Sequence, residues 1–93
     1  MDIIQTKIHL RLATQGKKCI TIIEGLDDDL DLIRISRAMK RTLNCAATVK
    51  MDHNNNEIIQ LQGDHRDTIS AWLVEAEILT GTEAADRVVV HGG

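Results

Sequence analysis

The chain has 93 residues and a formal net charge of −3 at pH 7, which is enough length for one domain with a single modest core. Because the chain has no Phe, no Tyr and one Trp, that core must be aliphatic. No apolar run in the sequence approaches the roughly 20 residues that span a bilayer. The acidic total argues against indiscriminate nucleic-acid binding, and the charged start of the chain argues against a signal peptide, so we expect a cytoplasmic protein without membrane contact. Residues 1–6 are predicted to be a short N-terminal extension, and residues 7–93 a single domain.

A β-hairpin is predicted over residues 7–24. Residues 7–12 alternate polar and apolar side chains, as a half-buried strand does, and the β-branched run at 19–24 is its expected partner. Between them, Gln15 to Lys18 is a turn signal with a basic tip. Gly25 is predicted to end the second strand.

A helix is predicted from Leu32 onward. Asp27 to Asp29 can cap and start it, because acids suit the positive N-terminal end of a helix. Apolar residues then recur at i, i+3, i+7 and i+11 on one face, while the opposite side carries four cations. The apolar face comprises Leu32, Ile35, Met39 and Leu43, and the basic side comprises Arg34, Arg37, Lys40 and Arg41.

A second hairpin is predicted from two strands, Thr48–Met51 and Glu57–Gln62. The polar run from His53 to Asn56 separates them. Asn tolerates the left-handed backbone conformation that such turns need, so this run is expected to form the turn.

A second helix is predicted after this hairpin. Asp64 lies at the expected N-cap with Asp67 three residues on, and Thr80 with Gly81 is predicted to end the helix. A last strand is predicted over residues 87–91. The apolar stripe of the helix comprises Ile69, Trp72, Leu73, Ala76 and Leu79.

The element order ββαββαβ predicts an α+β fold. Two amphipathic helices need one shared apolar surface, which a sheet of about five strands provides. We therefore expect a two-layer α/β sandwich in which both helices cover one face of a five-stranded sheet. The other face should be open and polar, carrying Lys7, His9, Arg11, Thr21, Lys50 and Gln60.

The cluster Asp64-His65-Arg66-Asp67 allows three interpretations. It could be catalytic, but catalysis needs convergent side chains in a water-poor pocket. Residues in the first turn of a helix point in different directions, and no Ser or Cys nucleophile lies beside this cluster. A charged helix cap is the favoured interpretation. The third interpretation is a recognition site in which the helix start presents His65 and Arg66 outward.

The sequence does not favour a metal, a cofactor or a disulfide. Cys19 and Cys45 lie far apart without a CxxC motif, so both are expected to be small buried side chains in a reducing compartment. None of the four histidines are paired at i, i+3 or i+4, as zinc ligands often are. These histidines are His9, His53, His65 and His91.

Two basic zones remain as candidate contact surfaces. A charged helix face is often only solvated surface, and this interpretation stays open. Four cations without an intervening acid, together with the basic hairpin tip, also suit contacts to a phosphate backbone. Because the chain lacks aromatic platforms for stacking bases, structured RNA fits better than a single strand. The candidate RNA-binding residues are Gly16, Lys17, Lys18, Arg34, Arg37, Lys40 and Arg41.

Five stretches give the chain a family resemblance over nearly its whole length. They are "KIHLRL", "QGKK", "TIIEGLD", "IQLQGDHR" and the terminal "VHGG". Their order and near spacing resemble those of the eukaryotic translation initiation factor 1 family, the SUI domain, with its archaeal and bacterial relatives. The segment from Thr80 to Asp86 is longer than usual in that family.

The resemblance implies a non-enzymatic protein that binds the small ribosomal subunit near the peptidyl site and promotes accurate start-codon selection. Its implied partners are ribosomal RNA directly, and initiator tRNA and other initiation factors indirectly; a monomer is expected. The hairpin tip would lie nearest the codon–anticodon helix, and the basic helix would face ribosomal RNA. The motif implied in start-site accuracy comprises Gln62, Gly63, Asp64, His65 and Arg66.

Two alternatives stay open at this level. A ribosome-associated translational regulator would have the same fold but a stress or repression role. A small hydrolase would use Asp64, His65 and Asp67, and it would need a concave site at those residues.

Overall fold

The computed structural model describes residues 7–26 and 30–91. The expected extension at residues 1–6 and the expected cap at Asp27 to Asp29 lie outside the described residues. The elements, in chain order, are β1 (Ile8–Gln15), β2 (Lys18–Glu24), α1 (Leu32–Leu43), β3 (Ala47–Met51), β4 (Glu57–Gln62), α2 (Arg66–Glu75), α3 (Gly81–Arg87) and β5 (Val88–Val90).

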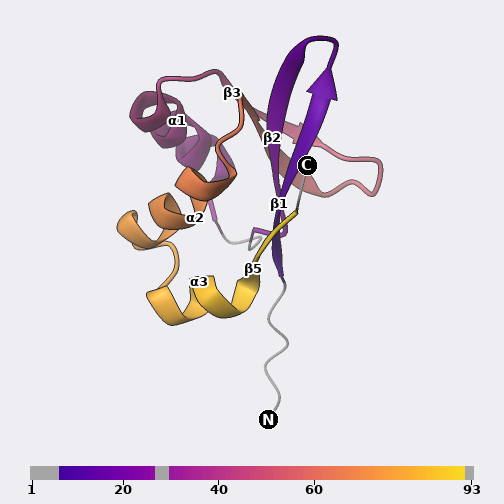
Figure 1. The fold of residues 1–93 in the computed structure, drawn as a ribbon. Helices are drawn as coiled ribbons and strands as arrows, with labels where there is room; N and C mark the ends of the chain where they lie inside the picture. The colour runs from indigo at the N-terminus through magenta and orange to yellow at the C-terminus, as the bar shows by residue number, and fades with distance from the viewer. Residues whose placement is uncertain (1–6, 27–29, 92–93) are drawn as a thin grey trace.

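The five strands form one mixed sheet in the order β3-β4-β2-β1-β5. All neighbouring strands pair antiparallel except β1 and β5, which pair parallel. The helices lie on one side of the sheet (Figure 1), so the predicted α+β two-layer sandwich is confirmed. In the described ranges, every helix is too short or too polar to cross a bilayer.

Both predicted hairpins are present. In the first, Gln15 pairs with Lys18, and Gly16 has a φ of 62°. Glycine with positive φ at the first central position is the signature of the type II′ turn, whose twist matches that of the flanking strands. In the second, the Asp52 carboxylate accepts hydrogen bonds from the backbone N–H groups of Asn54 and Asn56 at 2.8 and 2.9 Å.

Helix α1 follows its predicted apolar period. Its N-cap is Asp31, whose carboxylate accepts a hydrogen bond from the Arg34 backbone N–H at 3.2 Å. The helix buries Leu32, Ile35, Ser36 and Met39 against the sheet.

The second predicted helix is wrong in its length. Helix α2 ends at Glu75, and Glu77 takes the left-handed conformation with a φ of 62°. The N–H of Ile78 then bonds to the Leu73 carbonyl and that of Glu77 to the Val74 carbonyl, which is the Schellman pattern of a helix end. Ala76, expected in the apolar stripe, lies outside the helix and is exposed.

A third helix, α3, was not predicted. Thr80, expected to end the second helix, begins this one: its hydroxyl accepts from the Glu83 N–H, and the Glu83 carboxylate accepts from the Thr80 N–H. This capping box satisfies two orphan donors reciprocally. The described residues therefore form three helices on the sheet, and Arg87 belongs to α3 and not to the last strand.

The core lies between the sheet and the helices. Trp72 is 8% exposed and packs in the core, as its place in the apolar stripe predicts. The fully buried members of the cluster come from both layers: Ile8, Leu10, Ile23, Met39, Ile59, Leu61, Ile69 and Leu73.

Thr21 was placed on the wrong face of the sheet. It pairs with Leu12 and Leu61 and is 0% exposed, so it lies on the helix-covered side. Strand β2 is apolar on both faces, so no alternation of polar and apolar residues indicates which face Thr21 occupies. By the same register, the open face includes Ile20 and Ile58 and is less polar than expected.

Candidate RNA-binding interface

The tip of the first hairpin is a free basic projection. Gly16, Lys17 and Lys18 are all exposed, and the hairpin extends beyond the rest of the sheet (Figure 1). A two-residue turn fixes the direction of both strands, so the two lysines are presented from a defined position.

The four cations of α1 are exposed. Within the described part of the chain, none of them forms an ion pair, so their charges are available to a partner. Lys40 and Arg41 lie in the last turn, where the helix dipole favours cations. The cations are Arg34, Arg37, Lys40 and Arg41.

The Gly63 segment is anchored to β2 by three hydrogen bonds. The Gly63 N–H donates to the Cys19 carbonyl at 2.8 Å. The Thr21 hydroxyl donates to the Gly63 carbonyl at 2.6 Å and accepts from the His65 N–H at 2.8 Å. A single buried hydroxyl therefore fixes the backbone on both sides of Asp64. No sequence pattern indicates this role of Thr21.

Asp64 is not the helix cap that its position predicted. The N-cap of α2 is His65, which makes no side-chain capping bond. The Asp64 carboxylate instead accepts two hydrogen bonds from the Arg66 side chain, each at 2.9 Å, and a longer one of 3.4 Å from the Arg66 backbone N–H. This two-point pairing holds the pKa of the Asp64 carboxyl below its ordinary value of 3.8.

The side chains of His65 and Arg66 are turned toward their own chain. His65 Nε2 lies 2.8 Å from the Gln62 carbonyl oxygen. Arg66 also donates through Nη1 to the His91 carbonyl, and its side chain is only 18% exposed. The motif is thus a closed hydrogen-bonded unit with its exposed polar surface at Gln62 and Asp64, unlike the outward presentation considered from the sequence.

The end of β5 joins this unit to β1. The His91 N–H donates to the Leu10 carbonyl at 2.9 Å, and His9 Nδ1 lies 2.9 Å from His91 Nε2. Loss of contact with water, reinforced by the charges of Arg11 and His9, lowers the pKa of His91 below its ordinary value of 6.5. No local sequence pattern indicates this pair, because its members are 82 positions apart.

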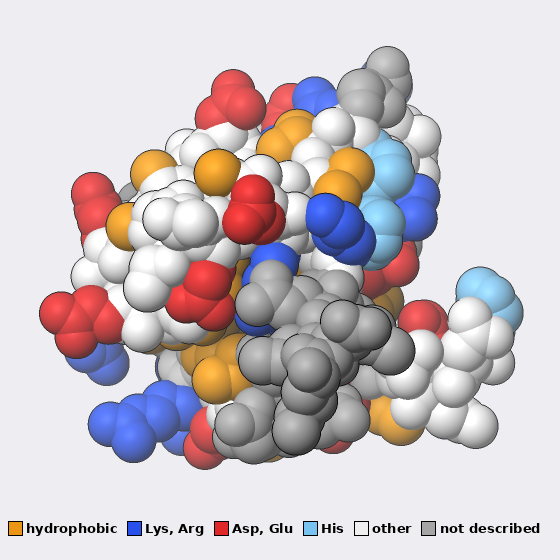
Figure 2. Space-filling view, turned by 90° about the horizontal axis from the view of Figure 1, so that it is seen from below, with side chains coloured by type: hydrophobic (Ala, Val, Ile, Leu, Met, Phe, Trp, Pro, Cys, Tyr) orange, Lys and Arg blue, Asp and Glu red, His pale blue; other side chains and the backbone are white. Residues whose placement is uncertain are grey.

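The three predicted groups converge at one end of the sheet. The Gly63 N–H bond to Cys19 places the motif at the base of the hairpin tip, and the Gln62 N–H bond to Ala46, at 3.0 Å, places it beside the segment that follows α1. In contrast, the end seen from below in Figure 2 shows basic side chains in separate places with acidic ones among them. The tip, the motif and the last turn of α1 therefore form one candidate surface.

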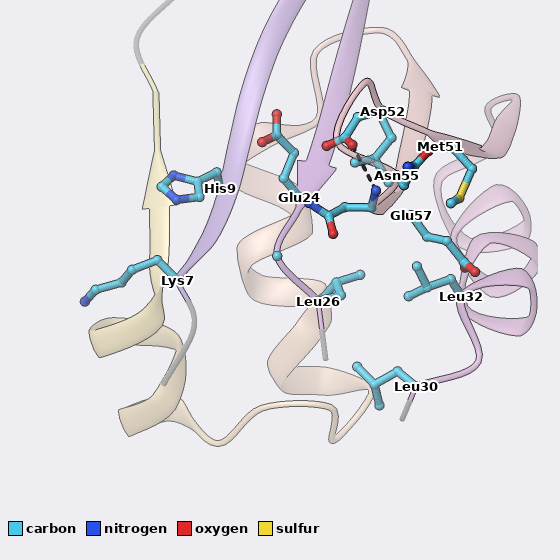
Figure 3. Close-up of a pocket in the computed structure, with 13 residues that line it drawn as sticks. Lys7, His9, Glu24, Leu26, Leu30, Leu32, Met51, Asp52, Asn55 and Glu57 are labelled. Carbon is cyan, nitrogen blue, oxygen red and sulfur yellow. Dashed lines mark hydrogen bonds between the residues drawn. The ribbon is translucent and has the colours of Figure 1, made fainter. Parts of the chain in front are cut away.

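A cavity is present in the described structure, but the residues that a hydrolase would use do not line it. A cavity of about 1030 Å³ opens between the ends of β1 and β2 and the second hairpin (Figure 3). Its polar lining includes Lys7, His9, Glu24 and Asp52, and it does not include Asp64, His65 or Asp67. Among the described residues, no group of three or more His, Cys, Asp or Glu side chains is arranged to hold a metal ion.

Comparison with known proteins gives consistent similarities. Residues 4–79 match the family described as Translation initiation factor SUI1. The chain is 35% identical over 92 residues to eukaryotic translation initiation factor eIF1 of Drosophila melanogaster, covering 98% of this chain and 80% of the relative. It is 37% identical over 86 residues to eukaryotic translation initiation factor 1 of Homo sapiens, covering 91% and 73%.

A solved structure shares the fold. The C-terminal domain of human eIF2D superimposes with a TM-score of 0.74 at 18% identity, covering 90% of this chain and 42% of that chain. At this identity the likeness concerns the arrangement of strands and helices alone.

Proposed function

Because the chain belongs to the SUI1 family of translation initiation factors, we propose that it binds the small ribosomal subunit near the peptidyl site and promotes accurate start-codon selection. The observation that carries this proposal is the convergence of the basic hairpin tip, the basic helix end and the Gly63 motif at one end of the sheet. The proposal includes that the protein acts in the cytoplasm, as a monomer and without catalytic activity.

Electrostatics supports ribosomal RNA as the direct partner. The exposed cations of α1 have no acidic partner among the described residues, and the tip adds Lys17 and Lys18. Unpaired cations gain most from phosphate contacts, because neutralising phosphates releases condensed counterions. The net charge of −3 limits binding to surfaces that face these two zones.

The proposed mechanism is a difference in affinity between two states of the subunit. A factor that opposes premature start-site commitment must bind the open, searching subunit better than the closed one. The rigid hydrogen-bonded motif suits this role, because it holds the tip and the helix end in a fixed relation. Initiator tRNA and other initiation factors are then indirect partners.

Sedimentation with purified small subunits tests the binding step. Arg41→Glu, in the last turn of α1, should weaken co-sedimentation and reduce the slope of log affinity against log salt by up to about one unit for a lost phosphate contact. Lys50→Glu makes the same change in charge on β3 and should leave both quantities near those of the parent chain. Equal binding by the parent and Arg41→Glu, with unchanged circular dichroism, would show that the end of α1 does not face RNA.

A further inference from the structure

The outer edge of β3 is open to pairing. β3 is the first strand in the sheet order, and its only neighbour among the described strands is β4. The Gln62 N–H bond to Ala46 and the Asp52 N–H bond to Asn56 fix the antiparallel ladder. Because hydrogen-bonded and non-bonded pairs alternate in such a ladder, residues 47, 49 and 51 direct their backbone N–H and C=O groups away from the sheet.

A shallow groove runs beside this edge. It has a volume of about 490 Å³ and lies between α1 and β3. Ile33 and Met51, which line it, are 56% and 58% exposed and are two of the three large apolar side chains exposed in the described residues. Met51 lies on the side of the second hairpin that faces α1 (Figure 3). An open strand edge beside exposed apolar side chains is the arrangement that accepts an added strand.

We propose that this edge and groove form a docking site for an extended, acidic peptide segment of a partner protein. The segment adds as a sixth strand along β3 and pairs with the backbone of Ala47, Val49 and Met51. Because side chains alternate along a strand, every second residue of the segment reaches the groove and contacts Ile33 and Met51.

The charges around the groove determine the chemistry of the partner. Arg37 and Lys40 lie four and seven positions after Ile33, which places them on the same side of α1. Lys50 adds a cation from β3, whereas Glu57 is the one acid in the lining. Acidic residues flanking the apolar contacts would therefore be drawn to the site.

Two other occupants fit less well. A second copy of the chain, paired edge to edge about a two-fold axis, would bring its own basic α1 toward this one, and like charges oppose that contact. RNA would use the cations but would leave the apolar side chains of Ile33 and Met51 and the strand edge without partners. The extended acidic peptide satisfies all three features.

The test uses a synthetic, end-blocked decapeptide in which Thr alternates with the row Glu, Val, Val, Val and Glu, so that the acids flank the apolar side chains on one face of the strand. A second decapeptide carries Lys in place of each Glu. Amide NMR spectra of the full chain should shift at Ala47, Val49 and Met51 on titration with the acidic peptide, and hydrogen exchange at these amides should slow at least fivefold. The basic peptide should bind at least tenfold more weakly.

Three variants locate the site. Ile33→Ser should weaken acidic-peptide binding at least fivefold, while Val90→Ser, which changes an exposed apolar side chain on β5, should not. Val49→Pro removes an outward N–H that β4 does not use and should abolish added-strand pairing without loss of the fold.

Four results would overturn the proposal. The first is the absence of saturable binding of the acidic peptide, and the second is equally tight binding of the basic peptide. The third is undiminished binding of the acidic peptide to folded Val49→Pro. The fourth is protection of the β3 amides only when the chain self-associates or when a structured RNA hairpin is added.

Discussion

Replacing Thr21 by Val separates hydrogen bonding from apolar burial at the centre of the motif. The substitution keeps the shape of a 0% exposed side chain and removes only the hydroxyl. The Gly63 carbonyl and the His65 N–H then lose the partner that lies 2.6 and 2.8 Å away. A polar group left without its partner costs about 1–3 kcal/mol. Two such groups, both partly reachable by water, give an expected loss of about 2–4 kcal/mol.

Thr21→Ser is the matched control. It keeps the hydroxyl and removes one methyl group, for an expected loss of about 1 kcal/mol. If only apolar burial mattered at this site, the order would reverse, and Val would be at least as stable as Thr. The hydrogen bonds predict that Ser is the milder change although Val is the closer match in shape.

Urea unfolding, followed by circular dichroism and by the fluorescence of Trp72, measures both variants. A domain of this length has roughly 5–14 kcal/mol of stability in total, so Thr21→Val should still fold and give a complete transition at lower urea. Hydrogen exchange at the His65 amide should accelerate more than global unfolding explains. A Thr21→Val protein within about 0.5 kcal/mol of the parent, which is the usual scatter of neutral substitutions, would refute the anchoring role.

Three further predictions concern the frame around the site. Gly25→Ala should lower the free energy of unfolding by about 2–4 kcal/mol, because the φ of Gly25 is 88° and the new Cβ would lie 2.1 Å from the Lys7 carbonyl oxygen. The control Gly16→Ala, at a φ of 62° with open space around it, should lower it by only about 1–2 kcal/mol. Equal losses for the two variants in urea unfolding would contradict the clash at Gly25. Trp72→Ala should cost about 3–5 kcal/mol by the same measurement, because it empties the largest side-chain volume of the core, and a neutral result would mean that Trp72 contributes no core packing. The pKa of His91 in the folded chain lies below 6.5, so near this pH the folded chain binds fewer protons at His91 than the unfolded chain does. Stability should therefore fall as the pH drops below about 6.5. His91→Gln should flatten this part of the pH–stability curve, and an unaltered curve would contradict a lowered pKa of His91.

Local patterns predicted the parts of the fold that local physics determines. The alternation at residues 7–12, the 3.6-residue period of α1 and the Asn-rich turn each gave the correct element. Thr21 was misplaced because the strand from Cys19 to Glu24 is apolar on both faces, so only tertiary pairing decides its side.

The remaining errors lie where competing local bonds decide the outcome. The second helix was extended to Thr80 because Glu77, unlike glycine, carries no sequence signal for a left-handed helix end. Asp64 resembled an N-cap, but the Arg66 side chain two residues on takes its carboxylate instead.

The candidate site was only partly visible in the sequence for a related reason. Basic residues on an exposed helix side and at a hairpin tip follow from pattern and composition. The bonds that bring them to one end of the sheet join distant positions, such as Thr21 with Gly63 and Arg66 with His91. A single sequence does not encode these pairings in any local period.

The ratio of UUG to AUG initiation in a dual reporter tests the proposed fidelity role most directly. The reporter is translated in a system in which this chain is the only factor of its family, so that its own activity sets the ratio. Asp64→Ala breaks the pairing with Arg66, whereas Asp67→Ala removes a nearby exposed carboxylate and serves as the control. We expect Asp64→Ala to raise the UUG-to-AUG ratio without a general loss of translation, and Asp67→Ala to leave the ratio unchanged. An unchanged ratio for normally expressed, folded Asp64→Ala would contradict a role of this motif in start-codon selection.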